Sequence, residues 1–184
     1  MPNNPLAIRE SRWKRTLYSH SAGVVLAQFE RDDPPRHTRS LYIRDAATLD
    51  YERLPAADDA TSYDSPVVAR SVPSVFFNVM VQNERGGGNW LHVARANIIT
   101  REIDVVFGLD ELVAFAKSEP RWHIGPWVAA LFDVSDDGII LTCKIGMPEP
   151  RPDGSYRMNY SLFDLDLSSR TLTHLADFNT TPGW

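Results

Sequence analysis

Leu162-Phe163-Asp164-Leu165-Asp166 carries the pattern that decides the fold, because the chain presents it twice more upstream. The matching stretches are Leu41–Asp45 and Trp90–Ala94, and each begins a hairpin-like segment of about fourteen residues. The arms of these segments hold β-branched and aromatic residues that suit a pleated sheet, and their centres are polar or small. The pattern predicts three two-stranded hairpins, which end at Leu54, Ile103 and Leu175.

Two further candidate strands precede each hairpin. The nearer ones are strongly apolar and superpose without a gap; they cover residues 23–29, 74–80 and 138–144. The more distant ones are shorter and cover residues 13–18, 66–71 and 127–133. Because self-similarity at a regular spacing marks a repeat protein, we predict a single domain of three four-stranded units, at approximately residues 13–55, 65–107 and 127–178.

The apolar strands alternate less strictly than strands with one wet face would, which favours strands covered on both faces. Stacked blades of a β-propeller provide that environment. The predicted fold is therefore all-β, with three four-stranded antiparallel, blade-like sheets that form a partial or dimer-completed propeller. A single β-barrel or a β-sandwich is the alternative, since any all-β chain contains short apolar strands separated by turns.

The long connection between the second and third units contains one helical pattern, with apolar residues at Leu109, Leu112, Val113 and Ala116. Acidic residues stand near the start of this segment and Lys117 near its end, which complements the helix dipole. Pro120 then blocks continuation of the helix. The pattern predicts one short amphipathic helix near residues 109–117, lying against the sheets.

Residues 132–141 read Phe-Asp-Val-Ser-Asp-Asp-Gly-Ile-Ile-Leu, a polar turn followed by an apolar strand, and Tyr160–Asp166 then ends a later strand in aspartate. This third unit resembles the repeat of TolB-like and WD-type β-propellers. In the TolB-like repeat the turn reads Ser-Pro-Asp-Gly, so Asp136 stands where the family has proline. The resemblance implies a propeller fold that serves as a protein-binding platform or as an accessory domain of peptidases. The Gly-x-Ser-x-Gly nucleophile elbow of such peptidases is absent from the sequence.

Three units are too few for a closed propeller, which needs about four to eight blades. An open arc would leave two apolar faces exposed to aggregation or pairing. Two explanations remain open: two chains form a six-bladed ring about a two-fold axis, or the sequence is part of a longer protein. We favour the homodimer as the prediction.

Composition and charge exclude several classes of protein. The net charge of −5 and the pI near 5.5 give no electrostatic footprint for nucleic acid. The opening residues contain no long apolar run, so we expect neither a signal peptide nor contact with a membrane, and a cytoplasmic location is the default. Cys143 is the one cysteine, which excludes an internal disulfide.

The most site-like stretch is Arg121-Trp122-His123-Ile124-Gly125-Pro126-Trp127. Its two tryptophans, histidine and arginine predict a stacking surface with polar groups, although the tryptophans could instead cap the core. A second candidate binding residue is Arg85, which lies in the glycine-rich connection between two strands of the second unit. Connections at this position in all three units would line one rim of a propeller.

No residue pattern predicts catalysis. The glycines at 86–88 match neither the dinucleotide nor the Walker pattern. Asp133, Asp136 and Asp137 lack the ligand spacing of a calcium loop, and the five histidines are not paired at metal-ligand spacing. Cys143 lies mid-strand as a small buried hydrophobe would. We therefore expect no catalytic residue, no metal and no cofactor.

These observations favour a non-enzymatic module that recognises a protein or peptide partner through the loops on one rim. Two alternatives stay open. One is a carbohydrate-active hydrolase or lyase that uses carboxylates in a central cavity. The other is a small-ligand-binding β-barrel, which would require strands that continue around one closed sheet.

Overall fold

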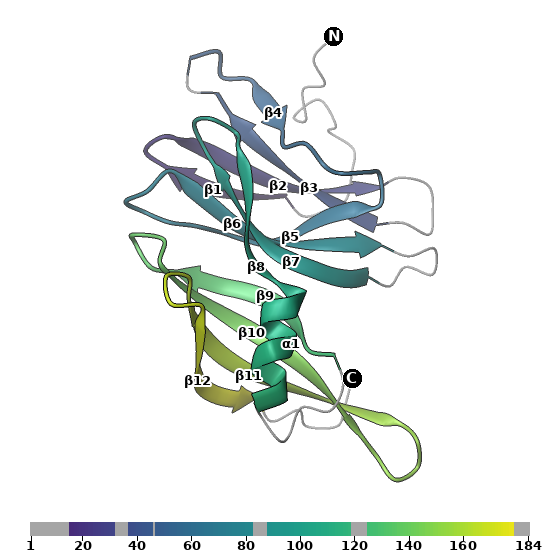
Figure 1. Ribbon diagram of the computed structural model, residues 1–184. Coiled ribbons are helices and arrows are strands. Elements are labelled where there is room, and N and C mark those ends of the chain that lie inside the picture. The colour runs from purple at the N-terminus through teal and green to yellow at the C-terminus, as the bar shows by residue number, and fades with distance from the viewer. Residues whose placement is uncertain (1–14, 32–36, 46, 83–87, 119–124, 179–184) are drawn as a thin grey trace.

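A computed structural model shows three four-stranded antiparallel sheets and one helix (Figure 1); it describes residues 15–31, 37–45, 47–82, 88–118 and 125–178. The first sheet contains β1 (Arg15–His20), β2 (Gly23–Arg31), β3 (His37–Arg44) and β4 (Tyr51–Arg53). The second contains β5 (Thr61–Val68), β6 (Ser74–Gln82), β7 (Gly88–Asn97) and β8 (Ile103–Gly108). The third contains β9 (Trp127–Val134), β10 (Ile140–Pro150), β11 (Tyr156–Asp166) and β12 (Thr171–Phe178).

Within each sheet the strands follow one another in chain order, so each unit is a meander. This confirms the predicted fold class: an all-β chain of three blade-like sheets. The alternative of a single barrel is wrong, because the strands divide among separate sheets and do not continue around one. No helix among the described residues is long and apolar enough to cross a membrane.

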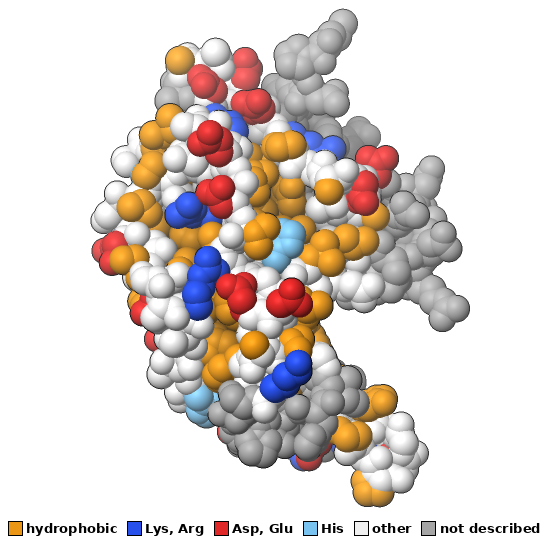
Figure 2. Space-filling view, in the orientation of Figure 1, with side chains coloured by type: hydrophobic (Ala, Val, Ile, Leu, Met, Phe, Trp, Pro, Cys, Tyr) orange, Lys and Arg blue, Asp and Glu red, His pale blue; other side chains and the backbone are white. Residues whose placement is uncertain are grey.

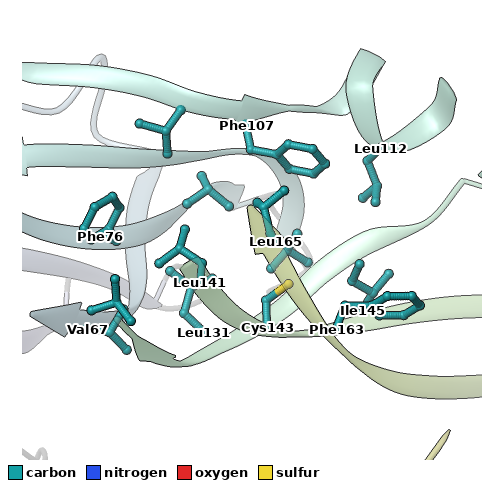
Figure 3. Packing of buried hydrophobic residues seen from close by; sticks show 14 of the residues in the cluster. Val67, Phe76, Phe107, Leu112, Leu131, Leu141, Cys143, Ile145, Phe163 and Leu165 are labelled. Carbon is teal, nitrogen blue, oxygen red and sulfur yellow. The ribbon is translucent and has the colours of Figure 1, made fainter. Parts of the chain in front are cut away.

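The second sheet lies between the other two and is buried on both faces. Phe77 of the second sheet packs in one cluster with Val25 and Ile43 of the first sheet. Phe76, its neighbour in β6, belongs to the cluster shared with Leu141 of the third sheet (Figure 3). Both phenylalanines are at most 1% exposed. Because successive side chains of a strand point to opposite faces, this pair shows that the sheets stack as layers.

The same hairpin turn joins the last two strands of every sheet. Its first residue accepts hydrogen bonds from two backbone N–H groups that lie two and three residues further on. These first residues are Asp45, Asn97 and Asp166. The bonds lower the pKa of both aspartates. The fifth residue has the left-handed backbone that few side chains adopt: Leu49 (φ 63°), Arg101 (φ 67°) and Arg170 (φ 59°).

This turn corrects the predicted register of the second unit. Asp45 and Asp166 occupy equivalent positions, as predicted, but their partner in the second unit is Asn97 and not Ala94. The predicted alignment is wrong there by three residues, an odd shift that exchanges the two faces of the strand. The cause is that Val93 and Ala94, on opposite faces of β7, are both fully buried. A strand that is apolar on both faces cannot fix its own register by hydrophobicity.

The first strand of the second unit also differs from its prediction. We expected residues 66–71, and the structure places β5 at Thr61–Val68. Ser65 and Pro66 lie inside the strand at a bulge, where the register with β6 shifts and Ser65 has φ 50°. A bulge leaves a residue outside the ladder, so it accommodates a proline that would otherwise remove a strand hydrogen bond.

The predicted helix is confirmed as α1 (Leu109–Ser118). Glu111 accepts a 2.5 Å hydrogen bond from the Gly108 N–H at the start of the helix, which is half of a capping box. Leu112 and Ala116 are buried in the cluster between the second and third sheets. The helix therefore covers the outer part of that junction, as Figure 1 shows.

Candidate functional site

Trp127 is the one predicted binding residue that the structure describes, and it lies at the rim of the third sheet. It is the first residue of β9 and pairs with Gly146 of β10. Its indole covers that glycine, because a Cβ atom at Gly146 would lie 2.6 Å from Cζ2 of the ring. The edge of the indole meets Tyr160 of β11 with ring centroids 6.1 Å apart. Trp127 is thus half-buried, and its indole is held between Gly146 and Tyr160, a position that we call the Trp127 seat.

This seat gives a first expected result. Gly146→Ala would place a methyl group where real Cβ atoms are essentially never found, so the indole or the backbone must move. We expect the free energy of unfolding to fall by about 1–3 kcal/mol, measured by urea denaturation. Gly125→Ala is the matched control, because a Cβ there meets nothing within 4 Å. An equal, small effect at both positions would show that the indole does not occupy this seat.

Beyond Trp127 the β10–β11 hairpin continues without a neighbouring strand among the described residues. β9 pairs with β10 only as far as Gly146, and β12 pairs with β11 only from Tyr160 onward. The ladder between β10 and β11 itself continues to the pair Pro150 and Tyr156. We call residues 148–159 the hairpin arm. Figures 1 and 2 show it standing away from the body of the protein.

Lys144 lies next to the base of the arm. Its Nζ atom is 4.2 Å from the ring centroid of Tyr160 and 5.2 Å from that of Phe178, at the end of β12. Both distances are within the range of a cation–π interaction. The lysine side chain therefore joins β10, β11 and β12 across the free face of the third sheet.

The other predicted binding residues, Arg85, Arg121, Trp122 and His123, lie outside the residues that the structure describes. Lys144, Tyr160 and the arm were missed by sequence reasoning, which treated the connection between the second and third strands of the third unit as a rim loop. The available signal was the alternation of large and polar residues from Tyr156 to Tyr160, which has the period of a strand. The prolines on the facing side concealed it.

Cys143 is buried among Leu141, Phe163 and Leu165 (Figure 3). Burial, helped by the carboxylate of Asp164, raises the pKa of its thiol to about 12. The thiolate, which is the reactive form, is therefore almost absent at neutral pH. We expect iodoacetamide to label the folded protein at pH 8 on the order of a thousandfold more slowly than the urea-unfolded chain. Mass spectrometry measures both rates, and similar rates would show that this thiol is open to reagents.

Asp137 and His174 are engaged in structural contacts elsewhere in the protein. Asp137 accepts hydrogen bonds from Ser135 and Ile139 in the β9–β10 turn, and these bonds lower its pKa. His174 pairs with Asp177 at 2.8 Å. No group of three or more histidine, cysteine or acidic side chains that could hold a metal occurs in the part of the chain that the structure describes.

An ion pair between Arg39 of β3 and Asp64 of β5 joins the first and second sheets. Burial lowers the pKa of the Arg39 guanidinium and raises that of the nearby Tyr18 phenol. The backbone N–H of Arg39 also donates to the Ser62 hydroxyl, at 2.9 Å. The contacts of Arg39 with Asp64 and Ser62 run between the two sheets, so they serve the packing of the two layers.

No protein-family model matches this chain, and no curated protein does. Among solved structures, an oligogalacturonate lyase in complex with manganese is similar over 91% of this chain and 48% of its own, with TM-score 0.46 and 12% identity. An endo-arabinase from Bacteroides thetaiotaomicron VPI-5482 is similar over 93% and 63%, with TM-score 0.43 and 13% identity. Both are β-propeller folds. This chain therefore spans about half the length of the first protein and less than two thirds of the second.

Proposed function

We propose that this chain is a non-enzymatic interaction module that binds a protein or peptide through the rim from which the hairpin arm projects. The observation that supports this most is the arm itself. Residues 151–157 are all exposed, yet the strands on either side of that loop stay paired beyond the edge of the sheet. Such projections on a rigid scaffold are where proteins place binding residues.

Hydrogen bonds hold the arm in one shape before any partner arrives. Asn159 donates to the carboxylate of Glu149 across the two strands, at 2.7 Å. In the connecting loop, Asp153 accepts from both the backbone N–H and the hydroxyl of Ser155, and these bonds lower its pKa. A preorganised surface loses less conformational entropy on binding, which favours affinity.

The side chains of the arm suit protein contact. Tyr156 is 57% exposed, and Arg157 beside it is exposed as well. Tyrosine and arginine are among the residues most often found at the energetic centres of interfaces. Trp127 and Tyr160 at the base of the arm add two further aromatic rings.

The pKa shifts of the acidic groups in the turns are opposite to the shift that a general acid requires. A glycosidase needs a general acid whose pKa is raised. Hydrogen bonds in turns instead lower the pKa of Asp45, Asp137, Asp153 and Asp166. The Cys143 thiol is buried and protonated. None of these five groups therefore suits the role of a general acid with a raised pKa.

Selection from a random peptide library on the immobilised protein tests the proposal. We expect selected peptides to bind the wild type in calorimetric titration and to bind Tyr156→Ala at least tenfold more weakly, a change of about 1.4 kcal/mol. The control is Ile99→Ala, which removes an equally exposed side chain from a turn of the second sheet. Peptides that bind both variants as tightly as wild type would place the site elsewhere, and failure to select any peptide would count against the function.

A further inference from the structure

The fifth residue of the repeated hairpin turn reaches back to the sheet that precedes it. In the second unit, Nε of Arg101 lies 3.6 Å from the carboxylate of Glu52 in β4. In the third unit, Arg170 pairs with Glu111 at 3.0 Å and also donates to the carbonyl of Val106 in β8. The same turn position therefore connects the second unit to the outer strand of the first, and the third unit to the outer strand and helix of the second.

In the first unit this position is Leu49. Among the described residues no sheet precedes the first one, so Leu49 has no earlier unit to contact, and it is 57% exposed. At the opposite end, β12 offers the surface that such a residue would meet. Val106 and Leu175 both lie nine residues after the first residue of their turns, Asn97 and Asp166, and both lie at a bulge of the outer strand. Val106 is 8% exposed, whereas Leu175 is 46% exposed.

At the inner strands, too, a residue that is buried between two units has an exposed equivalent in the first sheet. Leu17 pairs with Leu26 in the first sheet as Leu131 pairs with Cys143 in the third, at equivalent places in the repeat. Leu131 is buried where β5 and β9 meet, in the cluster that contains Val67 (Figure 3). Among the described residues no sheet precedes Leu17, which is 59% exposed.

The third sheet again carries the exposed counterpart. Val67 pairs with Phe76 as Asp133 pairs with Thr142, so Asp133 stands at the place of Val67, and Phe132 lies beside it in the bulge of β9. Phe132 is 53% exposed, in the strand that would meet a following unit. The two ends of the chain thus present matching pairs of exposed apolar residues, Leu17 and Leu49 at one end, Phe132 and Leu175 at the other.

Both end faces carry charged residues. Arg44 of β3 stands where the other units have Ala96 and Leu165, and its buried Nε has no hydrogen-bond partner. On the free face of the third sheet, Asp164 takes the place that Ile43 holds on the first. On the same face Lys144 lies over the rings of Tyr160 and Phe178, so we expect the Asp164 carboxylate to be the group that meets Arg44.

We infer that a second copy of this chain docks on the third sheet with its own first sheet, so that Leu49 meets Leu175 and Leu17 meets Phe132. The same contact formed twice about a two-fold axis closes six sheets into one ring. At the centre of the first sheet's outer face Leu26 and Tyr42 are already buried, so the exposed leucines at its two sides carry the new contact. The hairpin arm lies beyond the sheet and takes no part in it.

Light scattering and sedimentation equilibrium on the full chain test the inference. We expect a mass of twice 20.8 kDa at micromolar concentration. Leu49→Lys and Leu175→Glu alter exposed residues, and each is expected to weaken dimerisation at least tenfold while circular dichroism stays unchanged. Ile99→Lys and Val105→Glu are the matched controls, since these residues are exposed on the second sheet. A monomeric wild type would overturn the inference and would point to further units in a longer polypeptide.

Mixing the two single variants separates this ring from other dimers. A mixed dimer contains one unaltered junction and one junction that pairs the new lysine with the new glutamate, so we expect the mixture to dimerise more strongly than either variant alone. If only one of the two variants weakens the dimer, or if mixing restores nothing, then the two ends do not meet.

Discussion

Replacing Phe76 or Phe77 with alanine is expected to lower the free energy of unfolding by about 3–5 kcal/mol in each case. The two residues are neighbours in β6 and point to opposite faces, and each is fully buried against a different sheet. In a sheet with one face in water, truncating one of two neighbouring residues would change the free energy of unfolding only a little. Two large losses therefore follow only if the second sheet is covered on both sides.

Urea denaturation followed by circular dichroism measures both losses. Ile99→Ala serves as the control, because the side chain is 64% exposed, and we expect it to cost under about 0.5 kcal/mol. A loss below about 1 kcal/mol for either phenylalanine would mean that one face of the second sheet is open.

Asn78→Asp is expected to destabilise the protein by roughly 3 kcal/mol or more at pH 7. Asn78 is fully buried between the second and third sheets, where it donates to the carbonyl of Val128 at 3.3 Å and accepts from Nε1 of Trp90 at 3.2 Å. The substitution replaces the donor with a carboxylate oxygen that faces another oxygen. It also buries a negative charge that neither the Val128 carbonyl nor the neutral Trp90 indole neutralises.

The effect of Asn78→Asp has a defined pH dependence. Burial raises the pKa of the introduced carboxyl above its unfolded value of about 3.9. The folded state then binds its proton more tightly, so stability falls as pH rises above that unfolded value. We expect a smaller loss at pH 4 than at pH 7. Asn97→Asp is the control, because the other two units carry aspartate at this exposed turn position; equal losses at both sites would contradict the burial of Asn78.

The strands were predictable because they are short, apolar and separated by turn residues. Asp45 and Asp166 marked equivalent turns correctly, since an Asx side chain bonds its own backbone whatever the packing. In the second unit the same role falls to Asn97, and the strand before it is buried on both faces. Hydrophobicity alone therefore did not determine the alignment of that strand with the other units to within several residues. Turn chemistry would have settled it.

The candidate site was less predictable, because its geometry depends on pairing between strands. The seat of Trp127 requires a glycine at position 146, and only the register of β9 with β10 brings the two together. Pro148 and Pro150 indicated a loop, yet they lie in a strand. Proline lacks the N–H that a neighbouring strand would need, and β9 has already ended there. The prolines thus fit an arm that neither β9 nor β12 joins.

The stacking order of the three sheets is tested most directly by nuclear Overhauser effects from the rings of Phe76 and Phe77 in methyl-labelled protein. We expect the Phe76 ring to show contacts with methyl groups of the third sheet, such as those of Leu141, and the Phe77 ring with those of the first sheet, such as Ile43. Contacts from both rings to the same sheet, or from either ring to none, would contradict the layered arrangement of three units.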